Sequence, residues 1–366
     1  MNKNIHSEVA YIHGRPTGHP IHQAYAKSIN ADFYPVDFYL RWHDRPNSNR
    51  FRRYLSWLLC AFFFPNKKSY AIFFTECIRF PVIIMRWLGL LYREQRIIAL
   101  MANEALYFIY TKNYSSTASF AMKKYLRSCD AIICVGKMQA NLAREILKEN
   151  RPPIYTIYNG INIERFQKKI STSQSLSSKK ILFISNVDVE WRAWYKGTDL
   201  MFKAFDIVSK TIPDATFILI GRWDNTLFNQ QVNRYCASTK NNIVNIGYTD
   251  KLETYIGDAS IYLHCARGDA FPTTTMEVMA AGVVPIISEW TGTKEIVEQV
   301  DVRLVVPLDE VRIAEKIIWY LNLPISEKTM LSEKCKEVIK KYTEENAIQN
   351  FKEIFIEIAN DFKILL

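Results

Sequence analysis

The sequence predicts an α/β protein of two domains, each with strands and helices alternating around a parallel sheet. Three observations carry this prediction. The apolar run Val9 to His13 leads into a glycine-containing loop, a helical segment and a second strand, which is the opening of a Rossmann-like β/α/β unit. The same order begins again at Ile181, after a polar, serine-rich segment. With 366 residues, of which 49% are hydrophobic, the chain is long enough to bury two full cores.

The first domain is predicted to span residues 1–167. Its strands are short runs rich in β-branched and aromatic residues, at Val9 to His13, Phe33 to Phe38, Tyr70 to Phe74, Ile97 to Met101, Ala131 to Val135 and Ile154 to Tyr158. Helical segments separate these strands, at Ile21 to Ile29, Pro81 to Leu91, Ser119 to Arg127 and Lys137 to Lys148. Strands that alternate with helices pair in parallel, so one parallel sheet is expected.

A linker is predicted at residues 168–180 and a second domain at residues 181–345. Its strands are predicted at Ile181 to Ile184, Thr216 to Ile220, Ile243 to Ile246, Ile261 to Leu263 and Val284 to Ser288. Ser185 to Tyr195 is predicted to be a long loop, and helices are predicted at Lys196 to Ser209 and Val311 to Leu321. Apolar residues recur at helical spacing from Asn346 to Ile364, so residues 346–366 are expected to form a helix that packs back on the first domain.

Basic residues are concentrated in the first half of the chain. Residues 1–170 carry 25 Lys and Arg against 11 Asp and Glu, whereas the remainder carries 22 against 26. One interpretation is a solvated basic face, and the other is attraction to an anionic membrane surface or an anionic acceptor. The stretch Arg50 to Lys68 favours a membrane, because basic residues flank Trp57 and three phenylalanines. A buried helix has the same composition. No nucleic-acid partner is expected.

The seven cysteines are scattered and form no C-x-x-C pair. An odd, unclustered set is typical of a reducing compartment and argues against a disulfide framework or a zinc site. A cytoplasmic location without a bound metal is therefore predicted. No uninterrupted apolar stretch reaches about 18 residues, the length that spans a bilayer, and the N-terminal residues do not resemble a signal peptide. Membrane contact is therefore expected to be peripheral, on the inner face of the cell membrane.

The segment Arg267 to Gly282 combines a polar turn with a helix start between two carboxylates. Asp269 precedes the predicted helix and Glu277 lies in its first turns, so both side chains can face one cleft. A helix start carries unpaired N–H groups and the positive end of the helix dipole, which suits a diphosphate. A carboxylate accepts hydrogen bonds from two neighbouring hydroxyls at once, which is how sugars and riboses are held. The alternative is a core helix that follows a turn.

This segment resembles the donor-site signature of family 4 of the retaining glycosyltransferases, where two glutamates seven residues apart flank a Gly-Phe-Gly/Pro turn. Asp269 stands in place of the first glutamate and Ala270 in place of the glycine. The matching residues are Phe271, Pro272, Glu277, Met279, Ala280 and Gly282. Further matches are Asn159, Gly160, Ile161, Phe166, Lys196 and Gly197. The resemblance covers residues 155–320 well and residues 1–150 in outline.

The resemblance implies a GT-B fold and retaining transfer of a hexose-type sugar from a nucleotide-diphosphate sugar to a glycan or lipid-linked acceptor. It places such a reaction in surface polysaccharide or glycolipid synthesis, with no cofactor besides the nucleotide sugar. It implies catalytic roles for Lys196, Asp269 and Glu277. The donor-binding residues that it implies are Arg192, Lys196, Gly221, Tyr248, Asp269, Phe271, Pro272, Thr273, Thr274 and Glu277. The acceptor-side residues are Gly14, Gly18, His19, Asn103 and Glu104.

A non-catalytic partner or sugar-binding subunit of the same fold is the alternative. Three departures from the family's pattern motivate it. Asp269 replaces glutamate, Asn186 stands where an arginine is usual, and no histidine occurs near Asn103. Arg192 lies in the same predicted loop as Asn186 and is the residue expected to supply the missing phosphate contact.

Overall fold

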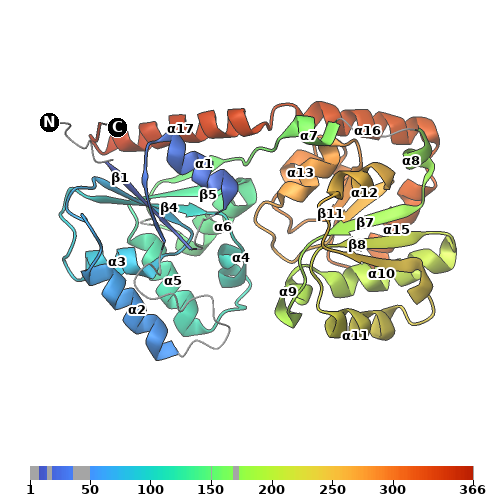
Figure 1. Cartoon of the computed structure of the whole chain (residues 1–366), viewed down its shortest axis with the longest axis horizontal. Helices are drawn as coiled ribbons and strands as arrows, with labels where there is room; N and C mark the ends of the chain where they lie inside the picture. The colour runs from blue at the N-terminus through green and yellow to red at the C-terminus, as the bar shows by residue number, and fades with distance from the viewer. Residues whose placement is uncertain (1–7, 15–18, 36–49, 150, 168–172, 366) are drawn as a thin grey trace. The chain divides into compact units, whose positions relative to one another are not determined.

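The computed structural model describes residues 8–14, 19–35, 50–149, 151–167 and 173–365. The chain divides into two compact units. Unit 1 consists of Met1–Gly160 and Glu344–Leu366, and unit 2 consists of Ile161–Thr343. Each unit is a three-layer α/β structure with one parallel six-stranded sheet between helices (Figure 1).

The sheet of unit 1 has the strand order β2-β1-β3-β4-β5-β6, and all of its pairs are parallel. The strands are β1 (Val9–His13), β2 (Asp32–Pro35), β3 (Ile72–Glu76), β4 (Arg96–Met101), β5 (Ala131–Val135) and β6 (Ile154–Ile157). Strands β1, β3 and β5 are buried along their whole length. Near-continuous apolar runs of this kind are expected for parallel strands that are covered on both faces.

The helices of unit 1 are α1 (Pro20–Ser28), α2 (Arg50–Phe62), α3 (Phe80–Trp87), α4 (Ala105–Tyr110), α5 (Ser116–Arg127), α6 (Lys137–Leu147) and α17 (Glu344–Asp361). Figure 1 shows α1 and α17 on one face of the sheet and α2, α3 and α5 on the other. Helix α17 is fixed by Phe351, whose ring stacks on Tyr25 at 4.6 Å and contacts Phe74 of β3. The C-terminal segment thus completes the core of unit 1.

The sheet of unit 2 has the order β12-β11-β10-β7-β8-β9, again parallel. Its strands are β7 (Lys180–Ile184), β8 (Thr216–Ile220), β9 (Ile243–Gly247), β10 (Ile261–His264), β11 (Val284–Ser288) and β12 (Val305–Val306). Its α-helices are α7 (Ile163–Gln167), α8 (Ser173–Ser177), α9 (Glu190–Tyr195), α10 (Thr198–Thr211), α11 (Asn225–Tyr235), α12 (Leu252–Asp258), α13 (Thr273–Ala280), α14 (Lys294–Val297), α15 (Glu310–Leu321) and α16 (Ile325–Ile339). Two short 3-10 helices cover Lys240–Asn242 and Val302–Leu304.

Both sheets reverse their strand order once. In unit 1 the reversal lies between β1 and β3, and in unit 2 it lies between β7 and β10. In open α/β sheets, ligands bind outside the carboxyl ends of the strands at such a switch point. The topology therefore marks one location in each unit where polar side chains are expected to gather.

The two parallel sheets confirm the predicted α/β fold class. Several local predictions were wrong. The predicted loop Ser185 to Tyr195 contains helix α9, and the predicted linker contains α8 and the first residue of β7. Leu176 of α8 is buried, which explains why a serine-rich segment is helical. The helix predicted at Pro81 to Leu91 ends at Trp87, because Gly89 adopts the left-handed conformation that stops a helix. Strand β3 lies two residues later than predicted and ends at Glu76.

Candidate active site

Asp269 occupies the switch point of unit 2, in the turn between β10 and α13. Its carboxylate pairs with Lys196 Nζ at 2.5 Å and with His264 Nε2 at 2.9 Å. Burial alone would raise the pKa of this carboxyl, but the charge of Lys196 and the hydrogen bond from His264 outweigh it and hold the pKa well below its usual range. Two of the residues predicted to be catalytic, Lys196 and Asp269, are therefore in contact although they lie 73 positions apart.

His264 connects Asp269 to the start of α13. Because the ionised Asp269 carboxylate only accepts, His264 Nε2 carries a proton, and burial lowers the pKa of the imidazole so that it is neutral. His264 Nδ1 then accepts from Tyr262 Oη at 3.1 Å, and Tyr262 Oη accepts from Thr274 Oγ1 at 3.0 Å. A directed chain of hydrogen bonds therefore runs from the helix start to the carboxylate and fixes its position.

Two glycines allow the backbone around Asp269 to pack closely. A Cβ atom at Gly292 would lie 1.6 Å from the carbonyl oxygen of Ala270, and the Gly292 N–H donates to the Asp269 carbonyl at 2.8 Å. A Cβ atom at Gly197 would lie 1.9 Å from the Cys265 carbonyl oxygen, and Gly197 also has a positive φ of 70°. The Lys196-Gly197 pair thus lets α10 begin directly against the end of β10, which brings Lys196 to Asp269.

Arg267 anchors the same turn. Its guanidinium pairs with both carboxylate oxygens of Asp199, at 2.7 and 2.8 Å, and donates to the Trp194 carbonyl at 2.6 Å. A bidentate pair of this kind adds geometric precision. Arg267 therefore holds the turn to α9 and α10, and its charge is neutralised within the fold.

Glu277 lies in α13 and is separate from the Lys196–Asp269 pair. Burial raises the pKa of its carboxyl to about 7, with the charge of Arg165 opposing and the charge of Glu253 adding to the effect. Arg165 is engaged elsewhere, since it pairs with Glu253 at 2.5 Å. Carboxyl groups whose pKa lies near neutral pH are common in functional sites.

The other predicted donor residues of this unit occupy three positions, at the entry to α13 and after the strands β8 and β9. Phe271, Pro272, Thr273 and Thr274 form the entry to α13, where Pro272 is the N-cap residue. Tyr248 follows β9, is 64% exposed, and carries the Arg222 guanidinium over its ring at 5.2 Å. Gly221 follows β8 with a positive φ of 128°, and a Cβ atom there would lie 2.1 Å from the Ser185 carbonyl oxygen.

Arg192 lies on α9, where its Nε is buried without a hydrogen-bond partner among the described residues. Asn186 accepts from the Arg222 backbone N–H at 2.8 Å, so the residue in the usual arginine position secures the loop after β8. Within the described ranges, no group of three or more His, Cys, Asp or Glu side chains is arranged to hold a metal ion.

The predicted acceptor-side residues lie at the carboxyl edge of the sheet in unit 1. The backbone N–H groups of Gly14 and His19 each donate to the Glu76 carboxylate at 3.2 Å. Asn103 caps the backbone N–H of Ala105 at 3.2 Å, and Glu104 is the N-cap residue of α4. Gly18 lies outside the described residues. Glu76 itself was not predicted from the sequence.

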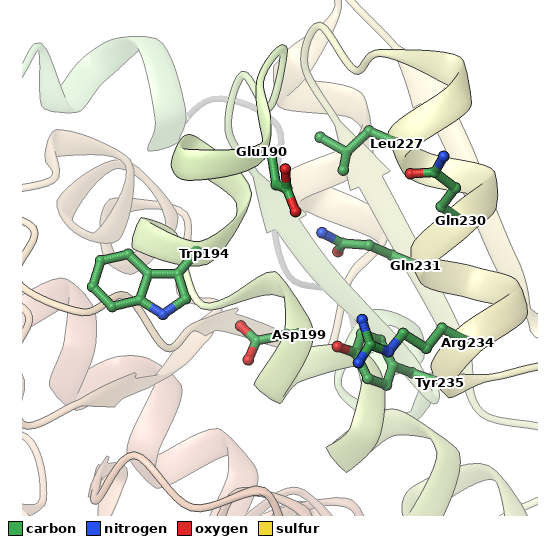
Figure 2. Close-up of a pocket in the computed structure, with 8 residues that line it drawn as sticks. All are labelled: Glu190, Trp194, Asp199, Leu227, Gln230, Gln231, Arg234 and Tyr235. Atoms are coloured by element: carbon green, nitrogen blue, oxygen red, sulfur yellow. The ribbon is translucent and has the colours of Figure 1, made fainter.

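A pocket opens in unit 2 between α9, α10 and α11, next to the site but apart from its charged centre (Figure 2). Its lining combines two aromatic rings with carboxylates, amides and a guanidinium, from Glu190, Trp194, Asp199, Leu227, Gln230, Gln231, Arg234 and Tyr235. Lys196, Asp269 and Glu277 do not contribute to this lining. Asp199 links the two features, because it pairs with Arg267 of the Asp269 turn.

His264 and Tyr262 were not predicted from the sequence. His264 contacts the Asp269 carboxylate, and Tyr262 contacts His264. Both lie on β10 two residues apart, so they point to the same face of the sheet. Two polar aromatic residues at this spacing in a buried strand were a detectable signal, because buried polar side chains require partners.

Comparisons with known proteins agree with this architecture. Residues 178–322 match the family model described as Glycosyl transferases group 1. A structure of sucrose-phosphate synthase from Thermosynechococcus elongatus is similar at a TM-score of 0.75 and 15% identity, over 96% of this chain and 99% of that chain. A structure from E. coli described as trehalose-6-phosphate bound with UDP-2-fluoro glucose is similar at a TM-score of 0.70 and 12% identity, over 98% and 99%.

The HepE protein of Anabaena in complex with UDP and glucose is similar at a TM-score of 0.67 and 11% identity, over 96% of this chain and 99% of that chain. No curated protein matches the chain by sequence. The fold is therefore that of the GT-B glycosyltransferases, and the family match falls on the unit that holds the Lys196–Asp269 pair.

Proposed function

We propose that the chain is a retaining glycosyltransferase that moves a hexose-type sugar from a nucleotide-diphosphate sugar to a glycan or lipid-linked acceptor. The observation that carries the proposal is the contact of Lys196 with Asp269 beside the start of α13, at the switch point of unit 2. A cation, a helix start and two carboxylates are the groups needed to bind a diphosphate on one side and sugar hydroxyls on the other. The family match over residues 178–322 supports the same activity.

In this proposal, donor binding exchanges the partner of Lys196. The diphosphate takes the ammonium group, together with the N–H groups around Thr273 and Thr274, and Asp269 then accepts from a hydroxyl of the hexose. His264 keeps its hydrogen bond to Asp269 throughout, so the carboxylate remains oriented. Glu277 accepts from the ribose hydroxyls, and the exposed ring of Tyr248 lies against the nucleobase.

The proposed chemistry places most of the catalytic work in positioning and electrostatics. The acceptor oxygen attacks the anomeric carbon on the face that the nucleotide leaves, and the bond between that carbon and the diphosphate oxygen breaks. The leaving diphosphate takes the acceptor's proton. Lys196 and the helix start stabilise the negative charge that develops on it, and we propose that no metal is required.

Donor binding tests this proposal directly. UDP-glucose is the first probe, because two of the similar structures contain UDP or a UDP-sugar. We expect a rise in melting temperature with increasing donor, since a ligand of the folded state stabilises it by mass action. Lys196→Ala and Glu277→Ala are expected to abolish this rise. Slow release of UDP by the intact protein distinguishes an enzyme from a non-catalytic sugar-binding subunit, which binds without turnover. If no nucleotide sugar in a donor panel is bound, the transferase proposal fails.

We also propose that unit 1 binds the anionic inner face of a membrane through an apolar surface on α2 and α3. Helix α2 turns Ser56 and Cys60 inward and leaves Tyr54, Leu58 and Phe62 exposed on the opposite side. Further exposed large apolar side chains of unit 1 are Leu55, Phe63, Trp87, Leu88 and Tyr92. Exposed large apolar side chains that gather on one side of a helix are typical of membrane or protein contacts.

Cations border this surface. Lys68 lies over the ring of Tyr92 at 5.6 Å and Lys124 over the ring of Trp87 at 4.7 Å, so charged groups accompany the exposed aromatic rings. Aromatic and basic residues mixed in this way suit the interfacial region of an anionic bilayer. None of the described helices is long and apolar enough to cross a membrane. All seven cysteines are buried and none forms a disulfide, which supports a cytoplasmic location.

Sedimentation with vesicles tests the membrane proposal. We expect binding to phosphatidylserine-containing vesicles at low salt, weaker binding at high salt, and weak binding to neutral vesicles. Leu58→Glu and Phe62→Glu are expected to abolish binding, whereas Met330→Glu, which changes an exposed apolar residue of unit 2, is expected to leave it intact. An equal effect of Met330→Glu, or no binding at low salt, would contradict the proposal.

A further inference from the structure

The pocket between α9, α10 and α11 of unit 2 is separate from the proposed donor site, because Lys196, Asp269 and Glu277 do not contribute to its lining (Figure 2). Its volume is about 190 Å³. Pockets that bind drug-sized ligands measure roughly 300–1,000 Å³. The pocket therefore suits a ligand the size of a single ring and cannot enclose a nucleotide sugar.

The formal charges around the pocket nearly cancel. The carboxylate of Asp199 is neutralised by its bidentate pair with Arg267, at 2.7 and 2.8 Å. The remaining charges are the carboxylate of Glu190 on α9 and the guanidinium of Arg234 on α11, and both residues are exposed, so water and salt screen them. With two carboxylates and one guanidinium, the lining favours neither a phosphate nor a metal ion. An uncharged ligand is the one that it suits.

Side chains in the pocket keep hydrogen-bonding capacity that the fold does not use. A carboxylate offers about four acceptor positions, and Arg267 occupies two of those of Asp199. Thr198 Oγ1 holds one end of the Gln231 amide at 2.6 Å, and the other end has no hydrogen-bond partner among the described residues. This amide points from α11 into the pocket (Figure 2). The Tyr235 hydroxyl also has no hydrogen-bond partner in the described part of the chain, so donors and acceptors are both available to a ligand.

Trp194 supplies an apolar wall. The residue is 40% exposed, and Figure 2 shows its ring across the pocket from the side chains of α11. Its position is fixed by Arg267, which donates to the Trp194 carbonyl at 2.6 Å and lies over the indole ring at 5.2 Å. A flat aromatic ring beside hydrogen-bonding groups matches a pyranose, whose faces carry C–H groups while its edge carries hydroxyls.

We propose that this pocket is a second carbohydrate site, which binds one neutral sugar residue of a glycan chain. The apolar face of the sugar lies against Trp194, and its hydroxyls donate to Asp199 and bond to the Gln231 amide and the Tyr235 hydroxyl. Side chains at the rim, such as Gln230, are exposed, so the chain can continue from the bound residue into solvent. The site holds a glycan acceptor or product at a residue away from its reacting end. This use rests on the proposed function, whereas sugar binding in the pocket does not.

Fluorine-19 NMR of the full chain labelled with 5-fluorotryptophan tests the site without knowledge of the natural glycan. The neutral probes are methyl glycosides of glucose, galactose, mannose and N-acetylglucosamine, and the charged probes are methyl glucuronide and glycine. Trp194→Phe assigns the resonance of Trp194. We expect a neutral glycoside to shift this resonance in a saturable way. The resonance of Trp319 is expected to stay unchanged, because that ring lies outside the pocket, with Arg303 and Lys316 over it.

The charged probes test the class of ligand. Methyl glucuronide carries a carboxylate and glycine is a zwitterion, so both are expected to bind more weakly than the neutral glycosides, or not at all. If no neutral glycoside shifts the Trp194 resonance, or if a charged probe binds more tightly, the pocket is not a site for a neutral sugar and the proposal is overturned.

Two variants separate ligand binding from a structural role. Gln231→Leu removes the amide and is expected to weaken the glycoside about tenfold, the effect of one hydrogen bond. It is expected to lower the melting temperature only slightly, because Thr198 Oγ1 keeps the Ala193 carbonyl as a partner at 3.2 Å. Tyr235→Phe removes a hydroxyl without a hydrogen-bond partner among the described residues, so we expect weaker glycoside binding at an unchanged melting temperature.

Asn233→Leu is the matched control, because Asn233 is an exposed amide on the same helix that does not line the pocket. It is expected to leave the glycoside affinity unchanged. Should Gln231→Leu and Tyr235→Phe both bind glycosides as tightly as Asn233→Leu, the sugar does not use the pocket and the site is refuted.

The outcome is independent of donor binding. Saturating UDP is expected to leave the glycoside affinity unchanged, since Lys196, Asp269 and Glu277 lie outside the lining. Competition between UDP and the glycoside would make the pocket a part of the donor site and overturn the proposal. A chain that binds glycosides at Trp194 but no nucleotide sugar contradicts the proposed transferase alone, and the reverse result contradicts this site alone.

Discussion

The two units hold a carboxylate at the switch point of their sheets in the same manner, with a histidine beneath it, but they finish the arrangement differently. In unit 2 the histidine is His264, which donates from Nε2 to Asp269 and accepts at Nδ1 from Tyr262. In unit 1 it is His22, which donates from Nδ1 to Glu76 and has an Nε2 without a partner among the described residues. The two imidazoles thus turn opposite ring nitrogens to their carboxylates.

This difference separates positioning from recognition. A hydrogen-bond chain that the fold completes by itself, such as the one from Thr274 to Asp269, fixes a group that a ligand will later use. A polar atom that the fold leaves without a partner is a place where a water molecule or a ligand can complete the bonding. In unit 2 the contact that the proposed donor would exchange is the one between Lys196 and Asp269.

Removal of Lys196 is expected to have the largest effect on stability of the variants that test the difference between the two units. In Lys196→Ala the Asp269 carboxylate stays buried with His264 as its remaining side-chain partner, and we expect a loss of about 3–5 kcal/mol in the free energy of unfolding, measured by chemical denaturation. Because the pKa of Asp269 is depressed in the folded state, this stability is present above about pH 4 and is lost as the pH falls below it.

Lys203→Ala is the control for this variant, because Lys203 pairs with Glu310 at 3.4 Å on the surface of the same unit and is expected to contribute less than about 1 kcal/mol. The double variant Lys196→Ala with Asp269→Asn removes both charges and is expected to recover most of the loss. Equal costs for Lys196→Ala and Lys203→Ala would show that the buried pair does not stabilise the turn.

Glu277→Gln is expected to increase stability while it removes function. Its pKa is raised to about 7 from an ordinary 4.5, so the folded state binds a proton more tightly than the unfolded state. Stability is therefore lost as the pH rises from about 4.5 to about 7, and the neutral glutamine is expected to gain about 3 kcal/mol at pH 8 and nothing at pH 4. Donor binding, measured by the thermal shift with UDP-glucose, is expected to fall.

The exposed Glu298, replaced by glutamine, serves as the control and is expected to change the free energy of unfolding by less than about 0.5 kcal/mol at either pH. A Glu277→Gln variant that is no more stable than the parent at pH 8 would mean that folding does not raise the pKa of Glu277.

The strands were predictable because buried parallel strands are continuous apolar runs, and runs such as Ala131–Val135 occur where the structure has them. Helices α8 and α9 were missed for a physical reason. Serine-rich and mixed polar sequences have weak local preferences, and burial of residues such as Leu176 and Tyr195 decides their conformation. Such burial depends on tertiary packing, which no local pattern records.

The site was predictable in part. Lys196, Asp269 and Glu277 could be singled out by motif, but the contact between the first two depends on the glycine at position 197, which brings α10 against β10. Glu76 and His22 carried no motif at all. They lie 54 positions apart, and only the parallel register of β1 with β3 brings the two segments together.

Tyr262→Phe removes the hydroxyl that joins His264 to Thr274 in unit 2. The imidazole of unit 2 then has a ring nitrogen without a partner, as the imidazole of unit 1 does among the described residues. Of the three main variants, this one is expected to change the free energy of unfolding least. The variant leaves His264 Nδ1 and Thr274 Oγ1 without the partner that joined them, so we expect a loss of about 1–3 kcal/mol in the free energy of unfolding. Nitrogen-15 NMR is expected to show His264 Nδ1 moving to the position of a nitrogen without a hydrogen bond. Tyr11→Phe is the paired measurement, since its hydroxyl makes no hydrogen bond of ordinary geometry among the described residues and interacts only weakly with Glu76, so it is expected to cost less than Tyr262→Phe. If both variants cost the same, the distinction between a hydrogen-bond chain that the fold completes and a polar group that it leaves without a regular partner is wrong.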